Sequence, residues 1–154
     1  FFLQWLEEIA PPVVRDKREL IIKQCLQPLP ALGRIPEWSV NASIHILSNH
    51  LTDWVLPILQ EVRSHLTTVT ISSEVGLRKP DLEIFKLVSG KLPEGYPVLY
   101  IDDQSKNLVP ATALGWNTLL ADEEGTWITR MEALLSASQA NTNSIEQQKA
   151  GDGG

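Results

Sequence analysis

The stretch PVLYIDDQSKNLVPATALGWNTLL, residues 97–120, decides the fold. Residues 97–101 are almost continuously apolar, which is typical of a parallel strand buried on both faces. Residues 108–114 favour a helix that ends at Gly115, because glycine is the commonest residue just past a helix. Residues 117–120 then indicate a second strand. A strand, a helix and a strand in succession predict two parallel strands of an α/β sheet.

The same alternation continues on both sides of this stretch. Upstream, β-branched and apolar runs predict strands at residues 43–47 and 67–71, and a helical pattern follows each. We expect one helical turn around Trp38 and full helices at residues 53–64, 82–88 and 127–135. The core is therefore predicted to be an α/β domain with a Rossmann-like parallel sheet over residues 28–135. In such sheets, functional polar residues lie just past the carboxyl ends of the strands.

Two regions of different character flank this core. Residues 1–27 contain two helical patterns separated by Pro11 and Pro12, and a capping pair that starts at Asp16 begins the second helix. Residues 136–154 consist largely of Ser, Gln, Asn, Ala and Gly, a composition typical of a disordered tail. Neither region is expected to add a strand to the sheet.

The composition excludes several classes of protein. Of the 154 residues, 43% are hydrophobic and 21% are charged, which is ordinary for a soluble globular domain. The net charge of −6, without a cluster of Lys and Arg, argues against nucleic acid and anionic membranes as partners. No apolar run approaches the ~18 residues of a membrane span. The single cysteine, Cys25, cannot form a disulfide within the chain and fits a reducing, cytoplasmic compartment.

Two polar clusters follow expected strands in the first half of the core. Ser48 and Asn49 come directly after the strand at residues 43–47. The Ser48 hydroxyl can donate a hydrogen bond to a phosphate oxygen, although either residue could instead cap the next helix. Lys79 precedes Pro80, which restricts the backbone before it. An ammonium held in this way can neutralise a carboxylate and a phosphate together, although a solvated loop lysine fits the sequence equally well.

A third cluster is the acid pair Asp102–Asp103, which follows the strand at residues 97–101. Two neighbouring carboxylates repel each other unless a cation lies nearby. Oxygen ligands without His or Cys suit Mg²⁺, so the pair indicates a magnesium site. The alternative is a turn in which Asp103 bonds to its own backbone.

In order and spacing, these clusters resemble the second, third and fourth motifs of the haloacid dehalogenase-like (HAD) hydrolases. The second motif is an apolar strand that ends in Ser or Thr, matched by IHILSN with Ser48. The third is a lysine in the context G-x-x-K-P-D, matched by GLRKPDLEIF with Lys79. The fourth is an apolar strand that ends in acids, matched by VLYIDD with Asp102 and Asp103. The resemblance covers roughly residues 40–122.

The resemblance implies a Mg²⁺-dependent phosphatase that works through an aspartyl-phosphate on a small phosphorylated metabolite. Ser48 and Lys79 would hold the phosphate, and Asn49 would orient the substrate. Asp102 would anchor Mg²⁺, with Asp103 as a second ligand or behind it. The acid pair favours a phosphatase over a haloacid dehalogenase, which is the other activity that the resemblance suggests.

The chain departs from the family at the first motif, D-x-D-x-T/V, which carries the nucleophilic aspartate at the end of the central strand. Asp16 follows two valines, but Arg18 stands where the second acid is required. Without this strand, the strand near Leu47 and the strand near Tyr100 would be separated, with unpaired edges. A homodimer or a strand-swapped oligomer is one way to complete the sheet. The resemblance assigns residues 1–27 to a partial helical cap beside an incomplete HAD-like core.

We therefore predict no appreciable phosphatase turnover from this chain alone. One alternative is a non-catalytic protein of the HAD fold that binds phosphate or a partner. Another is a receiver-like module, but there the acid pair would precede the other motifs. His50 is close enough to the expected site to contact a substrate. Four other residues are expected to be structural: His45, Trp54, Trp116 and Cys25.

Overall fold

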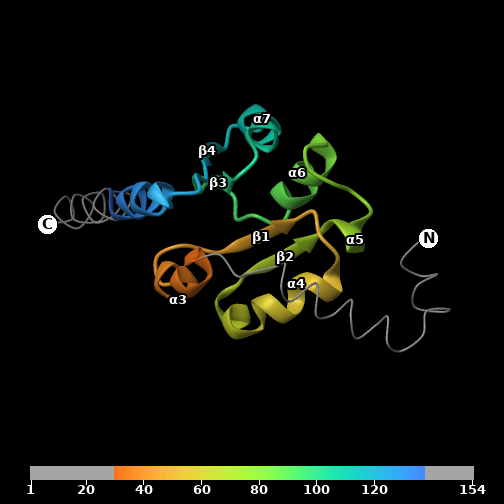
Figure 1. The fold of residues 1–154 in the computed structure, drawn as a ribbon. Helices are drawn as coiled ribbons and strands as arrows, with labels where there is room; N and C mark the ends of the chain where they lie inside the picture. The colour runs from red at the N-terminus through yellow and green to blue at the C-terminus, as the bar shows by residue number, and fades with distance from the viewer. Residues whose placement is uncertain (1–29, 138–154) are drawn as a thin grey trace, which may run out of the picture.

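The fold is a mixed α/β arrangement built on two pairs of parallel strands (Figure 1). The structure, a computed structural model, describes residues 30–137. Strand β1 (His45–Ser48) pairs with β2 (Thr68–Ile71), and β3 (Leu99–Asp102) pairs with β4 (Asn117–Leu120). The predicted parallel α/β character is confirmed. The helices predicted within residues 1–27 and the tail beyond residue 137 lie outside the described residues.

Helices lie between and after the strands, in the order that the sequence patterns predict. The short elements are the 3-10 helices η1 (Pro30–Arg34) and η2 (Gln60–His65) and the single turns α3 (Ile35–Trp38) and α5 (Ser72–Val75). The longer helices are α4 (Thr52–Leu59), α6 (Leu82–Ser89), α7 (Ser105–Ala113) and a last helix over residues 126–137. The patterns did not predict the turn α5 or the 3-10 helix η1.

The strand boundaries shift in a way that matters for the site. Strands β1 and β3 each begin two residues later and end one residue later than predicted. Ser48 pairs with Ile71, and Asp102 pairs with Leu120, so both polar residues belong to the strand ladders. Ser48 and Asp102 are therefore held by backbone pairing instead of lying on the following loops.

Two helix boundaries also differ. The helix predicted at residues 53–64 changes to 3-10 geometry at Gln60. The last helix continues through residues 136 and 137, which the composition had assigned to a disordered tail. The Ser136 hydroxyl donates to the backbone carbonyl of Glu132 at 2.9 Å, so this polar side chain is satisfied within the helix. Gly115 follows α7 with φ 78°, as the predicted helix-terminating glycine requires.

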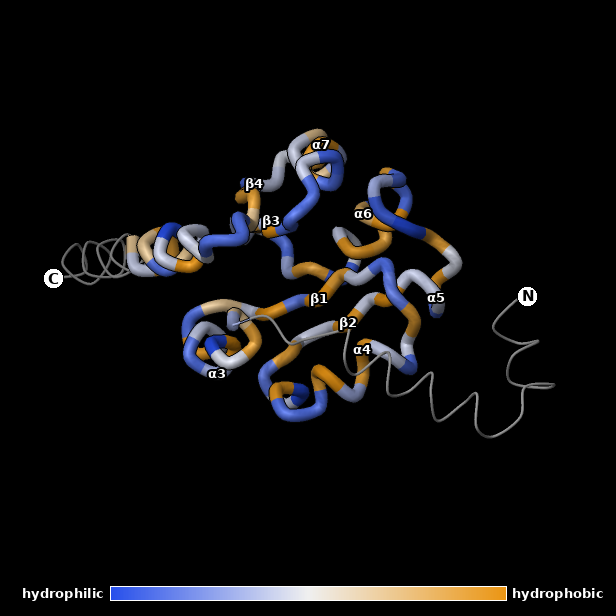
Figure 2. The backbone as a smooth tube through the Cα atoms, in the orientation of Figure 1, coloured by the Kyte–Doolittle hydropathy of each residue, from blue (hydrophilic) through white to orange (hydrophobic). Residues whose placement is uncertain are grey.

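Two apolar cores cover the opposite faces of the strands. Side chains along β1 and β3 alternate between them, as the pleat of a strand dictates: Ile46 and Ile101 pack in the first core, and Leu47 and Tyr100 in the second. Helices α3 and α4, η2 and the last helix cover the first core, and α6 and α7 cover the second. Figure 2 shows the apolar segments running along these elements and the polar segments in the turns between them.

Aromatic side chains make close contacts in both cores. In the second core, Phe85 meets Tyr100 edge to face with their ring centroids 5.4 Å apart, and Trp116 lies 6.1 Å from each. In the first core, Trp38 of α3 meets Trp127 of the last helix at 6.2 Å. This second contact links the β1–β2 half to the β3–β4 half, because α3 precedes β1 and the last helix follows β4.

Candidate functional site

Asp102 is the centre of the polar contacts at the carboxyl end of β3. Its Oδ2 accepts hydrogen bonds from Lys79 Nζ and Tyr100 OH, both at 2.6 Å. Its Oδ1 accepts from the Gln104 backbone N–H at 2.9 Å and from Asn107 Nδ2 at 2.8 Å. Each carboxylate oxygen thus has two donors, which is about its full capacity. Asp102 is 6% exposed, so these contacts fix its position in the interior.

The same contacts set the protonation of the cluster. Burial by itself would raise the pKa of Asp102, but the hydrogen bonds from Lys79, Tyr100 and Asn107 outweigh it and lower the pKa to about 2. Burial raises the pKa of the Tyr100 phenol, and the hydrogen bond to the Asp102 carboxylate raises it further. At neutral pH the cluster therefore contains an ionised Asp102 and a neutral Tyr100.

Lys79 connects the two strand pairs. Its backbone N–H donates to Asn49 Oδ1 at 2.7 Å, and its carbonyl accepts from Asn49 Nδ2 at 2.9 Å. Asn49 follows β1, whereas Asp102 ends β3, so Lys79 joins the carboxyl ends of these two strands. The Lys79 side chain is only 12% exposed. The alternative of a solvated loop lysine is therefore wrong.

Ser48 lies at the same end of the strands, and its hydroxyl is not used as a helix cap. Helix α4 begins after Leu51, which makes no side-chain cap hydrogen bond, and the Thr52 N–H at its start donates to Ser73 Oγ at 3.0 Å. Ser48 Oγ instead accepts a hydrogen bond from the His50 backbone N–H at 3.2 Å. The side-chain amide of Asn49 is hydrogen-bonded to the backbone of Lys79. The capping alternative is therefore wrong for both residues, and within residues 30–137 no acceptor takes the Ser48 hydroxyl proton.

Asp103 differs from Asp102 in its surroundings. It is exposed, and among residues 30–137 no hydrogen bond reaches its carboxylate. The described residues contain no group of three or more His, Cys, Asp or Glu side chains placed to hold a metal ion. The carboxylate chemistry fits Mg²⁺, which commonly takes one or two carboxylates together with waters. Because the oxygens of Asp102 are already engaged, Asp103 is the acid with free ligand atoms.

Sequence reasoning missed Tyr100 as part of this cluster. Its position carries a signal, because residues two apart in a strand share a face and Tyr100 is two residues before Asp102. Asn107, the second contact that sequence reasoning did not assign to the cluster, is 2% exposed and comes from the first turn of α7. It reaches Asp102 because α7 starts directly after the strand.

The other histidines and tryptophans have mainly structural surroundings. His45 Nδ1 hydrogen-bonds to Thr68 Oγ1 at 2.8 Å, and burial lowers the pKa of His45. The His50 ring lies 6.5 Å from the Trp54 ring, centroid to centroid, beside the Ser48 end of the site. Trp116 packs in the second core. Cys25 lies outside the described residues.

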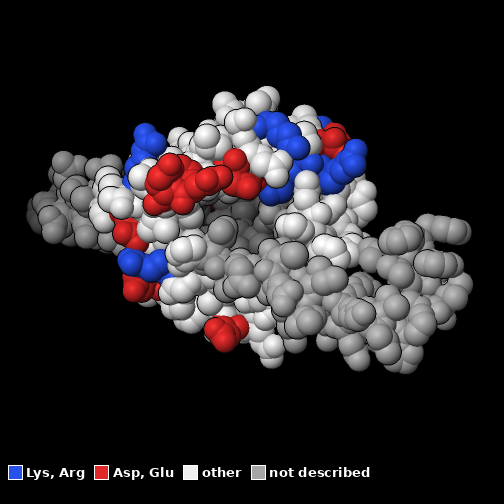
Figure 3. Space-filling view, in the orientation of Figure 1, with Lys and Arg blue, Asp and Glu red and all other residues white. Residues whose placement is uncertain are grey.

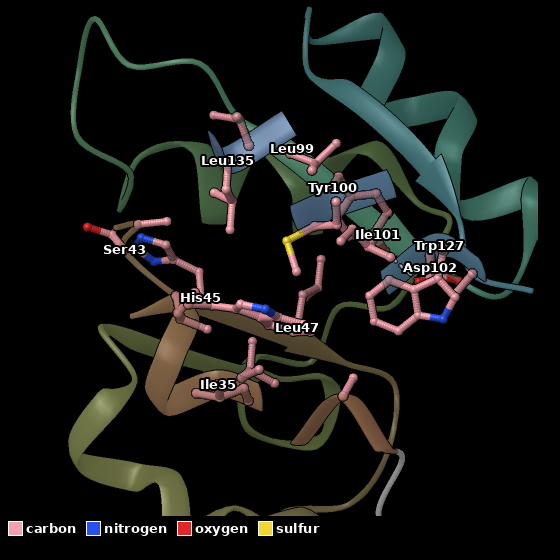
Figure 4. Close-up of a pocket in the computed structure, with 18 of the residues that line it drawn as sticks. Ile35, Ser43, His45, Leu47, Leu99, Tyr100, Ile101, Asp102, Trp127 and Leu135 are labelled. Carbon is pink, nitrogen blue, oxygen red and sulfur yellow. Dashed lines mark hydrogen bonds between the residues drawn. The ribbon is translucent and has the colours of Figure 1, made fainter. Parts of the chain in front are cut away.

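A cleft separates β1 from β3. Its volume is about 2580 Å³, and it is lined by residues 43–47 on one side and 97–103 on the other. Figure 4 shows His45 and Leu47 on one side of the opening and Leu99 and Ile101 on the other. The lining side chains with acidic groups are Asp102, Asp103 and residues 122–124, and Figure 3 shows acidic side chains gathered beside a hollow in this face. Lys79 lines the cleft beside these acids.

Comparison with known proteins finds similarity to a curated hydrolase. The chain is 29% identical over 89 residues to the bifunctional epoxide hydrolase 2 of Sus scrofa. The matched region is 57% of this chain and 16% of that protein, so the chain corresponds to a small part of the relative. No family model matches the sequence. The similarity is to a hydrolase, and among the described residues no helix is long and apolar enough to cross a membrane.

Proposed function

We propose that this chain carries the phosphate-binding part of a HAD-like, Mg²⁺-dependent phosphatase. The contact that carries the proposal is the double engagement of Lys79, whose backbone is clamped by Asn49 and whose ammonium meets Asp102. It gathers Ser48, Lys79 and the acid pair at one edge, where ligands of parallel α/β sheets bind. The resemblance to a hydrolase agrees with this class of reaction.

The proposed fold follows from the same arrangement. The pairs β2–β1 and β3–β4 would be the two sides of one Rossmann-like parallel sheet of HAD type, with the cleft at the position of the central first strand. Helices on both faces of the strands support this reading, since doubly covered parallel sheets are buried on both faces.

In this proposal each residue acts on the phosphate through charge and position. The Ser48 hydroxyl would donate to one phosphate oxygen, and the Lys79 ammonium would share its charge between Asp102 and the phosphate. Asn49 would act by fixing the Lys79 backbone instead of orienting substrate. Because the Lys79 side chain is largely shielded from water, its attraction to a phosphate is screened less than that of a surface lysine.

Mg²⁺ would add charge neutralisation and orientation of the phosphate. We propose Asp103 as its carboxylate ligand. Asp102 would lie behind Asp103 and hold Lys79. The sequence had suggested the opposite roles, with Asp102 as the main Mg²⁺ ligand. The substrate class proposed is a small phosphorylated metabolite.

The chain alone is proposed to bind phosphate without turning over a phosphomonoester. Among the described residues, the carboxylates that line the cleft at this edge are Asp102, whose oxygens are saturated, Asp103, which we propose as a metal ligand, and the three acids at 122–124 that follow β4. None of them stands in a D-x-D-x-T/V sequence, the motif that supplies the nucleophile in the HAD-like hydrolases. This observation also favours the second candidate, a non-catalytic phosphate-binding protein of the same fold, which an upstream nucleophilic motif in the source gene would argue against.

The test is a titration of the chain with inorganic phosphate, with and without Mg²⁺, followed by amide chemical shifts. We expect Mg²⁺ to strengthen binding, because Asp103 repels phosphate until a cation neutralises it. Lys79→Met should weaken phosphate binding at least tenfold. Lys86→Met is the matched control, because Lys86 is an exposed lysine paired with Glu83, and it should leave binding unchanged. Equal binding by both variants would contradict the proposal.

A parallel assay measures hydrolysis of p-nitrophenyl phosphate with and without Mg²⁺. We expect no Mg²⁺-dependent turnover above that of the Asp103→Asn variant. Turnover that requires both Mg²⁺ and Asp103 would show that a nucleophile is present after all, and Asp16 would be the first carboxylate to replace.

A further inference from the structure

The phenol of Tyr100 is held in a fixed place beside Asp102. Tyr100 is 9% exposed and belongs to β3, where it pairs with Thr118 of β4. Its ring packs against Phe85, with the ring centroids 5.4 Å apart, and against Trp116, with the centroids 6.1 Å apart. Backbone pairing and aromatic packing restrict both the position and the rotation of the ring, so its hydroxyl is a fixed donor.

Tyr100 and Lys79 donate to the same carboxylate oxygen. Both hydrogen bonds to Asp102 Oδ2 are 2.6 Å long, whereas Gln104 and Asn107 donate to Oδ1. A carboxylate oxygen has about two acceptor positions. The phenol fills one of the two on Oδ2 and therefore leaves the other for Lys79.

The Lys79 ammonium has more donors than its contact with Asp102 uses. An ammonium carries three N–H groups, and among residues 30–137 Lys79 Nζ donates a single hydrogen bond, to Asp102 Oδ2. The Lys79 side chain lines the cleft and is 12% exposed. The remaining N–H groups are therefore left for an anion that enters from the cleft.

The phenol also affects the competition between Asp102 and a phosphate for the ammonium. A hydrogen bond from a neutral donor offsets part of the charge of a carboxylate, and the effect is larger in a shielded cluster than in water. Without the phenol, Asp102 would hold Lys79 more tightly and would repel a phosphate more strongly. Position and charge thus act in the same direction.

We propose that Tyr100 is a positioning residue for phosphate binding and acts through Asp102 on Lys79. Its hydroxyl keeps the ammonium on the cleft side of Asp102 and leaves part of the ammonium charge for the ligand. A phenylalanine would fill the same place in the second core, so packing alone does not account for the hydroxyl. The inference rests on the proposed phosphate-binding function and extends it to a residue of the core.

The test compares binding of inorganic phosphate, in the presence of Mg²⁺, by the parent chain and two variants, followed by amide chemical shifts. Tyr100→Phe keeps the ring against Phe85 and Trp116 and removes only the hydroxyl. We expect it to bind phosphate about fivefold more weakly, roughly the effect of one hydrogen bond. Tyr96→Phe is the matched control, because Tyr96 is 72% exposed, and it should bind like the parent.

A double-mutant cycle separates positioning from a loss of stability. If Tyr100 acts through Lys79, Tyr100→Phe should weaken binding by less than about twofold in a chain that already carries Lys79→Met. A purely structural role would weaken binding by the same factor in both backgrounds. Equal factors, or unchanged binding by the Tyr100→Phe single variant, would overturn this inference and leave the proposed function standing. Absence of phosphate binding by the parent chain would overturn both.

A second measurement keeps Tyr100 in place. The chain has two tyrosines, so Tyr100 is the single fluorinated residue when Tyr96→Phe is produced with 3-fluorotyrosine. We expect the ¹⁹F signal to shift as phosphate is added, because the ligand shares the Lys79 ammonium with the oxygen that the phenol contacts. Phosphate binding in the amide spectrum without a change in the ¹⁹F signal would contradict the link between Lys79 and Tyr100.

Discussion

The carboxyl ends of β1 and β3 and the middles of the same strands are held in different ways. At the ends, Lys79 and Asp102 join the two halves through charged hydrogen bonds within a shielded cluster. Along the middles, no bond between the strands is present in the described part of the chain, and an apolar cleft separates them. The difference shows that side-chain contacts alone can join two separate pairs of parallel strands at their carboxyl ends. Four perturbations test this contrast.

The largest effect is expected from Asp102→Ala. The change leaves Lys79, Tyr100 and Asn107 without their acceptor in a buried place, including an unpaired cation. Removing one partner of a buried ion pair costs about 3–5 kcal/mol, so we expect a loss of about 4 kcal/mol in the free energy of unfolding, measured in urea. Asp103→Ala is the control and should change it by less than about 0.5 kcal/mol, because Asp103 is exposed.

A smaller loss is expected from Lys79→Met. Asp102 keeps its hydrogen bonds from Tyr100, Asn107 and Gln104. The variant therefore loses only the hydrogen bond from the Lys79 ammonium to Asp102, which joins the β3–β4 half to the β1–β2 half. A hydrogen bond to a charged group contributes about 1.5–3 kcal/mol, so we expect about 2–3 kcal/mol of destabilisation. Lys86→Met serves again as the matched control. A loss no greater than that of Lys86→Met would mean that the ends are not held by Lys79.

Acid should loosen the strand ends before it affects the apolar middles. The folded pKa of Asp102 is about 2, below its ordinary value of 3.8, so Asp102 contributes stability that is present above the unfolded pKa and is lost as the pH falls through about 2. The contribution is on the order of 2 kcal/mol. Urea unfolding between pH 5 and pH 2 should show this loss in the parent chain and not in Asp102→Asn. The same pH dependence in both would assign the loss to other groups.

The smallest effect is expected on the side of the cleft away from Lys79. Glu132→Gln removes the charge that Arg34 and Trp38 contact. The pair is partly exposed, at 45% for Arg34 and 34% for Glu132, so the loss should be below about 1 kcal/mol. Trp127→Ala, which removes the aromatic contact beneath it, should cost several times more, because deleting a buried tryptophan leaves a cavity. A larger effect for Glu132→Gln than for Trp127→Ala would reverse the roles assigned to charge and packing.

The sequence predicts the strand ends better than their connections. Hydrophobic patterns place Ser48 and Asp102 at the carboxyl ends of parallel strands, and such ends share one edge of a sheet. The clamp of Asn49 on the Lys79 backbone and the phenol of Tyr100 on Asp102 depend on tertiary packing, which no local pattern encodes. Tertiary packing also supplies the four hydrogen bonds that occupy both oxygens of Asp102. Of the two neighbouring acids, Asp103 is therefore the one without a hydrogen bond among the described residues.

The opening between β1 and β3 could be predicted from the sequence, but the contacts that hold its two sides could not. The resemblance to HAD-like hydrolases predicts that the strands near Leu47 and Tyr100 lack a neighbour, and in the described residues they belong to separate pairs. The sequence gives no sign of the contact between Trp38 and Trp127, because these residues are far apart along the chain. Packing at long range therefore decides whether the halves stay in place.

The central claim, that Lys79 and Asp102 join the two halves at the strand ends, is tested most directly by titrating the Asp102 carboxyl with ¹³C NMR. The structure predicts that Asp102 titrates with a pKa of about 2 and that Lys79→Met raises it, whereas Lys86→Met does not. An Asp102 that titrates near its ordinary value of 3.8, unchanged by Lys79→Met, would contradict the account.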